Sequence, residues 1–306
     1  MKNLFSITAL AILIPLSGIS QNTLDILTLS GKYTTPQNYD STYNGKAQEK
    51  GSFIGLTLPI PINDKTIIYN SLNYFYFHVD NEADMPDNIV DPINLHGFII
   101  RTGLVQKLNN GQSIQLLFSP RIMTDMQGGG TDNLQLGGLA VYEKKLKENL
   151  TMGFGAMLNN DFFGPYLVPL INLNWNISEK FSITGMLPVY AKINYKVSDK
   201  FTFGISHFGL TTSFGLNGEN YSTDYIERQS IDLGLFAAYN VANNIYIEAR
   251  IGKSMSRVYK QYAADDKLDL AMPLVTFGDN RTVKNVQFED GMYCELRLIY
   301  RIKIPE

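Results

Sequence analysis

Apolar and polar residues alternate along most of this chain, and the alternation is clearest near its C-terminus. Leu296 and Leu298 fall on one face of an extended strand, whereas Glu295, Arg297 and Arg301 fall on the other. A repeat of two residues indicates a β-strand, because successive side chains of a strand point to opposite faces. One face of this strand therefore suits lipid and the other suits water.

Short polar turns separate the alternating runs on one side of the predicted sheet, and longer loops separate them on the other. The short turns are Asn63-Asp64-Lys65, Asn109-Asn110-Gly111, Lys147-Glu148-Asn149, Ser178-Glu179-Lys180, Ser198-Asp199-Lys200 and Ala242-Asn243-Asn244. The longer connections are near 36–51, 80–94, 125–132, 160–165, 216–224 and 260–287. Short turns at one rim and long loops at the other are typical of bacterial outer-membrane β-barrels.

The runs between these connections predict an all-β fold, a transmembrane up-and-down antiparallel β-barrel of about fourteen strands. The predicted strands are 23–35, 52–62, 66–79, 95–108, 112–124, 133–146, 150–159, 166–177, 181–187, 189–197, 201–215, 225–241, 245–259 and 288–304. The arms of the hairpin at 181–197 are short for spanning strands, which take about 9 to 11 residues. Twelve full strands with an irregular pair is therefore the alternative.

The alternation also assigns strand residues to the lipid or to the lumen. We expect Leu298→Arg to block assembly, because a charge on the lipid face near mid-membrane costs about 2 to 4 kcal/mol. We expect Ile299→Arg to be tolerated better, because Ile299 faces the lumen.

The N-terminus predicts export. Lys2 precedes an apolar stretch at 4–16, and small residues follow it up to Ser20. This pattern is typical of a secretory signal peptide, which we place at 1–20, with a single barrel domain at 21–306. The stretch is shorter than the about 20 residues of a membrane-spanning helix. We therefore expect the outer membrane of a Gram-negative bacterium, with lipid, lipopolysaccharide and the barrel-assembly machinery as partners.

Composition narrows the remaining classes of function. The mean hydropathy of -0.09 fits a barrel, because only alternate residues of a spanning strand face lipid. Cys294 is the single cysteine, so no internal disulfide forms. The net charge of -3 gives no sign of a nucleic-acid partner. We expect no cofactor and no metal.

Aromatic residues recur at matching depths. Trp175, Tyr195 and Tyr239 each stand three residues before a short turn, and Phe181 and Phe201 directly follow two of the turns. Rings at one shared depth predict an aromatic girdle at the membrane interface. A secreted β-sandwich, the alternative fold, does not predict such a shared depth.

Several segments together resemble an uncharacterised family of outer-membrane β-barrel proteins found in Bacteroidota. They are the signal peptide ending before Gln21, the turns at 176–181 and 196–201, Gly164-Pro165, Leu187-Pro188 and the closing segment at 295–301. The resemblance covers essentially the whole mature chain. It implies a barrel fold, and it implies no catalytic residue because the family has no assigned activity.

Charged residues on the inward faces are the candidates for function. The candidates for lining the lumen and setting selectivity are Arg101, Arg121, Lys192, Lys196, Asp232, Glu248, Arg250, Glu295, Arg297 and Arg301. Basic groups predominate, which predicts a passive or facilitated channel for small polar or anionic solutes. The alternative is a closed barrel with a structural or surface-binding role, in which Glu248, Arg250, Glu295 and Arg297 form a salt-linked ladder that fills the interior.

Two long loops have unusual compositions. The segment 260–287 is too apolar for a freely solvated loop, and we expect it to form a short extra strand rather than a constriction inside the pore. The loop at 80–91 is acidic but lacks the regular spacing of a calcium-binding loop. We interpret it as a solvated acidic loop.

An outer-membrane hydrolase is the third hypothesis. The chain has three histidines, so few residues could serve as its catalytic base. His78 and His96 flank one loop, whereas Ser206 and His207 are adjacent in one strand and so point to opposite faces. Ser206 and His207 therefore cannot form a nucleophile and base pair. We predict that the protein is not an enzyme and name no catalytic residue.

Overall fold

The computed structural model describes residues 23–39, 44–82, 84–128, 133–221 and 223–303. The expected signal peptide at 1–20 lies outside these residues. No helix within the described ranges is long and apolar enough to cross a membrane.

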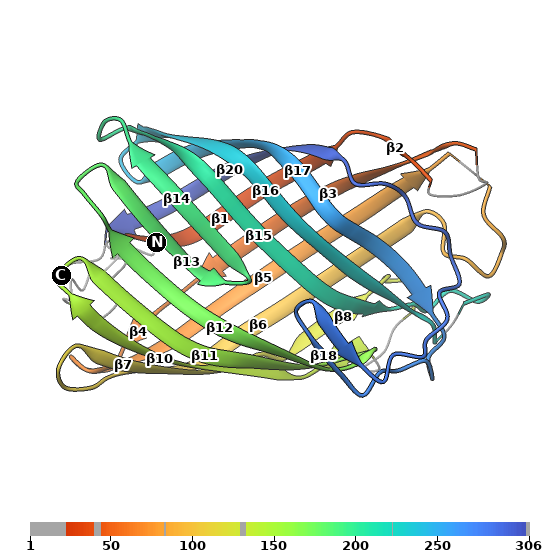
Figure 1. Cartoon of the computed structure of the whole chain (residues 1–306), viewed down its shortest axis with the longest axis horizontal. Helices are drawn as coiled ribbons and strands as arrows, with labels where there is room; N and C mark the ends of the chain where they lie inside the picture. Colours follow the sequence, from red (N-terminus) through yellow and green to blue (C-terminus); the bar gives the residue numbers. More distant parts are fainter. Residues whose placement is uncertain (1–22, 40–43, 83, 129–132, 222, 304–306) are drawn as a thin grey trace, which may run out of the picture.

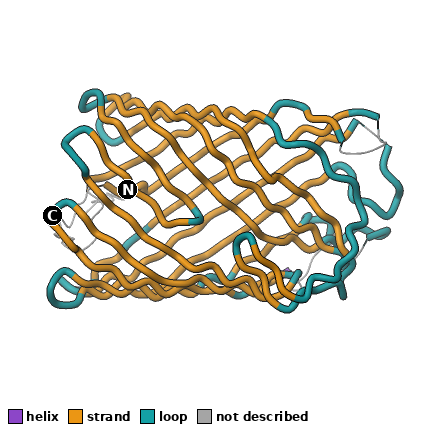
Figure 2. Tube along the Cα trace, viewed as in Figure 1, coloured by secondary structure: helices purple, strands orange, loops and turns teal. Residues whose placement is uncertain are grey.

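The described chain forms one closed antiparallel β-barrel with fourteen wall strands, which confirms the predicted fold (Figures 1 and 2). The wall strands are β1 (Thr23–Thr34), β3 (Lys46–Thr57), β5 (Thr66–Asn81), β6 (Ile93–Lys107), β7 (Gln112–Phe118), β10 (Gly137–Lys147), β11 (Leu150–Asp161), β12 (Gly164–Asn176), β13 (Phe181–Leu187), β14 (Tyr190–Lys196), β15 (Phe201–Gly215), β16 (Tyr225–Ala242), β17 (Ile245–Tyr262) and β20 (Met292–Lys303). Each pairs with the next wall strand, and β20 closes the ring against β1 with Leu298 opposite Leu29.

Shorter strands extend the wall at several places. They are β2 (Gln37–Asn38), β4 (Ile60–Pro61), β8 (Arg121–Thr124), β9 (Leu134–Gln135), β18 (Leu270–Met272) and β19 (Val275–Phe277). The hairpin of β18 and β19 comes from the apolar segment 260–287 and pairs with β12 through Ala271 and Tyr166. This segment therefore forms the expected extra strand.

The predicted short turns all connect wall strands at one end of the barrel, which we call the inner end; the long connections lie at the outer end (Figure 1). Local hydrogen bonds explain the turn sequences. The side-chain oxygen of Asn63 accepts from the backbone N–H groups of Lys65 and Thr66, at 2.9 Å each. Ser178 and Ser198 make the same kind of bond to the residues that follow them, so the polar triplets cap their own turns.

The outer surface is an apolar belt. Side chains such as Leu72, Ile100, Leu235 and Leu296 are exposed on the face opposite the lumen. Trp175, Tyr195 and Tyr239, the rings predicted for the inner girdle, are exposed as well. Large apolar groups exposed all around a closed barrel indicate that lipid, rather than water, surrounds it.

One strand begins earlier than predicted. β3 starts at Lys46, whereas the sequence placed a loop before residue 52. The sequence predicts a loop at 46–51 because this stretch is polar. In the structure it is a strand whose inward side chains, Ala47 and Glu49, are fully buried. Pro59 lies in the break between β3 and β4, where a residue without an N–H donor leaves no ladder hydrogen bond unmade.

The hairpin of β13 and β14 is the short part of the wall. Each strand has 7 residues, whereas the flanking β12 and β15 have 13 and 15. Leu187 at the end of β13 pairs with Ile171, and Tyr190 at the start of β14 pairs with Phe208. Beyond these residues β12 and β15 continue toward the outer end without an intervening wall strand.

Candidate functional site: the lumen

The outer end of the lumen is filled by side chains from opposite walls. Phe77 of β5 meets Phe214 of β15 edge-on, with ring centroids 6.3 Å apart and an interplanar angle of 82°. Both rings are buried, as are Met123, Ile226 and Tyr259, and we call these five side chains the outer plug. Lumenal side chains of an open pore contact water, so the burial of the outer plug shows a lumen closed at this end.

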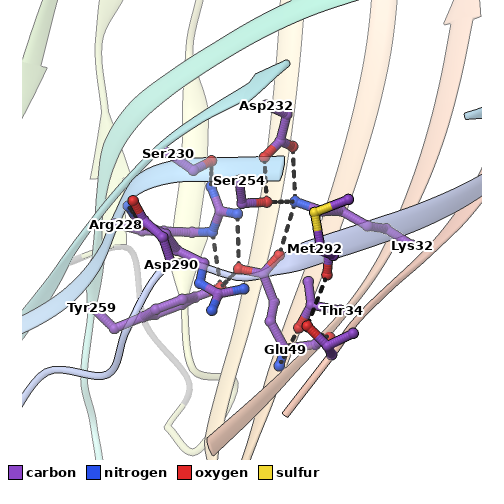
Figure 3. A network of polar contacts seen from close by, with 12 residues as sticks. Lys32, Thr34, Glu49, Arg228, Ser230, Asp232, Ser254, Tyr259, Asp290 and Met292 are labelled. Atoms are coloured by element: carbon purple, nitrogen blue, oxygen red, sulfur yellow. Dashed lines mark hydrogen bonds and ion pairs between the residues drawn. The ribbon is translucent and has the colours of Figure 1, made fainter. Parts of the chain in front are cut away.

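Four charged residues, Lys32, Glu49, Arg228 and Asp232, form the outer network together with Tyr259 of the outer plug (Figure 3). Lys32 Nζ lies 3.1 Å from Glu49 Oε1 and 2.7 Å from Asp232 Oδ2. Arg228 Nη2 lies 3.1 Å from Glu49 Oε2, and the Tyr259 hydroxyl donates to that same oxygen at 2.6 Å. The network thus joins β1 and β3 to β16 and β17.

Glu49 and Arg228 are both fully buried, although their strands are separated in the wall by β1, β20 and β17. The guanidinium carbon of Arg228 also lies 3.7 Å from the centre of the Phe77 ring. A buried ion pair is tolerated only when its partners satisfy each other, so these contacts depend on both walls staying close. Two cations, Lys32 and Arg228, pair with two carboxylates, Glu49 and Asp232, and the buried Arg257 is a third cation close to Glu49.

A second cluster, the inner network, occupies the lumen nearer the short turns. It consists of Asp25, Lys192, Glu248, Arg250, Glu295, Arg297 and Arg301. Glu248 is its centre, with Lys192 Nζ at 2.6 Å, Arg250 Nη2 at 2.7 Å and Arg297 Nε at 3.6 Å. Arg250 and Arg297 lie 3.3 Å and 3.7 Å from Glu295 as well. These contacts confirm the predicted ladder between β17 and β20.

The inner network is wetter than the outer one. Arg301 is paired with Asp25, at 3.0 Å between Nη2 and Oδ2, so the cluster has four cations against three carboxylates. The side chains of Lys192, Arg297 and Arg301 are 22%, 17% and 23% exposed, in contrast to the fully buried Glu49. The inner lumen is therefore reachable by water and carries a surplus of positive charge.

The remaining predicted site residues lie elsewhere. Asp232 belongs to the outer network. Arg101 is half-buried on the lumenal face of β6, and no carboxylate of the described residues pairs with it. Arg121 is buried at the outer end in an ion pair with Asp161 at 2.8 Å, and Lys196 is half-exposed at the inner rim, 2.7 Å from Asp199. A role for either residue in selectivity stays a prediction.

Sequence reasoning missed Lys32, Glu49 and Arg228. Lys32 and Arg228 lie on inward positions of predicted strands, so the alternation alone contains the signal that finds them. Glu49 fell in a predicted loop, and nothing in its neighbourhood indicates that two distant cations neutralise it.

His78 and His96 lie near each other, as expected, on the outward faces of β5 and β6. His78 Nε2 lies 2.7 Å from Asp80 and its Nδ1 lies 2.8 Å from Asn94, so both ring nitrogens have partners. His96 Nδ1 lies 2.9 Å from the Tyr74 hydroxyl. Neither ring bonds a serine within the described ranges, and no group of three or more metal-ligating side chains is found there.

The outer segment that follows β19 is fastened to the barrel by ion pairs. Arg281 lies 2.7 Å from Glu227 and 2.9 Å from Asp279, and Lys284 lies 2.8 Å from Asp224. Hydrogen bonding from Arg281 lowers the pKa of Asp279 below its ordinary value. These charges hold the segment over the outer ends of β16 and β17.

Comparison with known proteins gives a family and a set of similar barrels. A family model described as "Domain of unknown function (DUF6268)" matches residues 19–269. No curated protein matches the sequence.

Three similar solved structures are outer-membrane proteins of low sequence identity. An outer membrane channel from Pseudomonas putida F1 is 12% identical, with 91% of this chain and 96% of that chain covered and a TM-score of 0.44. The NanC porin is 10% identical, covering 90% and 100%, with a TM-score of 0.37. The translocator domain of the autotransporter NalP from Neisseria meningitidis is 12% identical, covering 91% and 89%, also at 0.37.

Proposed function

This chain belongs to the DUF6268 family, which has no assigned activity, and on the geometry of its lumen we propose that it is an outer-membrane barrel conducting small polar or anionic solutes when its outer plug opens. The inner network would attract the solute, and the outer plug would gate it.

The surplus of cations in the inner network carries this proposal. Charges that line a narrow passage in a low-dielectric wall set which ions enter it. Arg297 and Arg301 are partly exposed to the lumen, and Arg101 adds a further positive charge on the opposite wall. An anion entering from the inner end would therefore meet guanidinium groups before it reached the outer network.

The membrane assignment rests on the closed barrel, its apolar belt and its aromatic girdle. Export by a cleaved signal peptide, an origin in Bacteroidota, and contacts with lipopolysaccharide and the assembly machinery stay predictions from the sequence.

The test is single-channel conductance of the protein purified from outer membranes, with the reversal potential measured under a salt gradient. We expect brief conducting events with anion preference. Arg297→Gln together with Arg301→Gln should shift the reversal potential toward cation preference. Lys196→Gln, which removes a half-exposed cation at the rim, is the matched control and should change it little. An unchanged preference in the double variant would remove these two residues from the pathway.

A closed barrel with a structural or surface-binding role is the second candidate, and the complete burial of the outer plug favours it. It predicts silence in the same experiment, including from variants whose plug has been removed. We propose no hydrolase, since both ring nitrogens of His78 are already bonded to Asp80 and Asn94.

A further inference from the structure

The short hairpin of β13 and β14 ends within the depth of the membrane. Its strands have 7 residues each. At about 3.3 Å per residue and a tilt of about 40°, such a strand rises roughly 18 Å, whereas the apolar band of an outer-membrane barrel is about 25 Å tall. Part of the lipid-facing wall between β12 and β15 is therefore built by something other than paired strands.

Above this hairpin, β12 has the features of a sheet edge. Pro165 and Pro169 lie in this stretch, and proline is confined to edges because it donates no ladder hydrogen bond. The only backbone contacts on this side come from the outer segment, where Ala271 pairs with Tyr166 and the Leu268 N–H donates to the carbonyl of Phe163 at 2.9 Å, within the described residues.

Side chains, rather than a strand ladder, close this stretch against β15. Asp161 Oδ1 accepts from the backbone N–H and the hydroxyl of Ser213, at 3.0 Å each, and from the Thr212 hydroxyl at 3.3 Å. The Phe162 N–H donates to the Ser213 hydroxyl at 2.8 Å, and Arg121 holds the other oxygen of Asp161 at 2.8 Å. We call these five residues the seam.

The two walls overlap at the seam instead of meeting edge to edge. Asp161 lies on the lumenal face of β11, as its alternation with the exposed Asn160 and Leu158 shows. Ser213 lies on the β15 face opposite Phe214, which points into the outer plug. The outer end of β15 therefore passes inside β11 and β12, and such an overlap can slide without breaking a ladder.

Two bonds tie residues 188 and 189, at the tip of the short hairpin, to β15 below the seam. The Gly209 N–H donates to the carbonyl of Val189 at 2.8 Å, and His207 Nε2 lies 2.8 Å from the carbonyl of Pro188. Leu187 beside the tip, and Ile171, its partner on β12, are exposed apolar groups of the belt. The lower margin of the seam therefore faces acyl chains.

A path lies on either side of the seam. Outside it is a hollow of about 300 Å³ with a mixed lining, in which Leu134, Pro165 and Leu268 are apolar and Asn160, Asp161 and Lys267 are polar or charged. Inside it, apolar side chains of the lumenal face form one continuous cluster, which includes Val141, Met157, Val168, Leu170 and Met186. The charged inner network offers no such surface.

We propose that the seam is a lateral exit through which amphipathic molecules with an acyl-like chain pass between the apolar side of the lumen and the bilayer. The occupant is identified by the apolar cluster inside the seam, by the mixed lining outside it, which suits a polar headgroup beside a chain, and by the missing paired strands above the short hairpin. This activity goes beyond the proposed conduction of polar solutes and does not depend on it, because the lateral path bypasses the outer plug.

Fluorescence quenching by membrane lipid tests the exit directly. The reporter is Met186→Trp in a Trp175→Phe background, since Trp175 is the only native tryptophan. The protein is placed in vesicles of phosphatidylcholine brominated on its acyl chains. Phe236→Trp, also inward-facing but beside Lys192 in the inner network, is the matched control reporter.

The seam is then closed or loosened. Phe162→Cys with Ser213→Cys, in a Cys294→Ser background, allows a reversible cross-link across it, and Asp161→Asn weakens it. We expect quenching of the 186 reporter that is lost on cross-linking, returns on reduction and increases with Asp161→Asn, while the 236 reporter stays unquenched. Quenching that is absent in the reduced protein, equal for both reporters, or unaffected by the cross-link would overturn the proposal. Reversal in one sample separates these outcomes from misfolding.

Discussion

Gly215 and Thr124 are backbone partners in parallel orientation, although β15 and β8 belong to opposite sides of the barrel wall. The Asp125 N–H donates to the carbonyl of Gly215 at 3.1 Å next to this pair. The outer closure therefore involves main chain as well as the rings of the outer plug. Truncating the rings should loosen the closure without removing it.

We expect Phe77→Ala with Phe214→Ala to raise the frequency and size of conducting events in a planar bilayer. The two rings meet across the lumen, so their removal opens space at the point of closure. Each truncation of a core Phe costs about 3 to 5 kcal/mol, so the variant should also unfold at lower urea concentration.

Phe154→Ala with Phe203→Ala is the control for the plug, because both rings are exposed on the outward face. It removes the same atoms and should leave conductance unchanged. Equal conductance from both double variants would mean that the outer plug is not the barrier.

Leu298→Arg should prevent assembly of the barrel. Leu298 is 46% exposed on the outward face near the middle of β20, where a buried charge costs about 2 to 4 kcal/mol. Asn194→Arg, at a half-buried inward position near the inner rim, should assemble normally. The fraction that migrates as folded barrel on an unheated gel measures both, and equal fractions would contradict the face assignment.

Glu248→Gln should destabilise the barrel by about 3 to 5 kcal/mol, because it leaves Lys192, Arg250 and Arg297 around an uncharged group in a buried site. Urea unfolding in lipid vesicles measures the loss. Glu148→Gln removes a carboxylate whose side chain is 97% exposed and should cost almost nothing. A midpoint equal to that of the control would show that the network is not essential to the fold.

Acid should loosen the outer segment, because Asp279 lies in the same segment as Arg281 and holds it in place for its ion pair with Glu227 of β16. Because hydrogen bonding from Arg281 lowers the pKa of Asp279 in the folded protein, the stabilisation is present above the unfolded pKa of about 3.9 and is lost as pH falls through the lower folded value. Cleavage of the segment by an acid protease should therefore rise steeply below about pH 3.9. Asp279→Asn should be cleaved readily on both sides of this pH, and a pH profile identical to that of the unaltered protein would refute the role of this pair.

The strand pattern was predictable because its causes are local. In β20, alternate side chains face lipid and lumen, so apolar and polar residues alternate. In the turns, the side chains of Asn63, Ser178 and Ser198 accept hydrogen bonds from backbone N–H groups of the same turn. These signals need no knowledge of which strands oppose each other. They gave the fold class, the fourteen strands and the inner network between β17 and β20.

The closed interior was not predictable because its causes are distant. Ile299 illustrates this: the sequence placed it in a watery lumen where Arg would be tolerated, but it is completely buried. The alternation correctly predicted that Ile299 points inward. Whether an inward side chain meets water depends on side chains from other strands of the barrel. The burial of the charged Glu49 has the same kind of cause. Its partners Lys32 and Arg228 come from other strands and reach it only when the barrel is closed.

Because of the short hairpin, the barrel has a different diameter at its two ends. Fourteen strands surround its inner end, and without β13 and β14 twelve surround its outer end. Because the diameter of a barrel grows roughly in proportion to its strand number, the outer half is narrower, and side chains of ordinary size can touch across it. Shortening one hairpin therefore lets side chains of the wall close a wide barrel at one end, where the loop residues Val90, Leu216 and Phe288 pack into the same cluster.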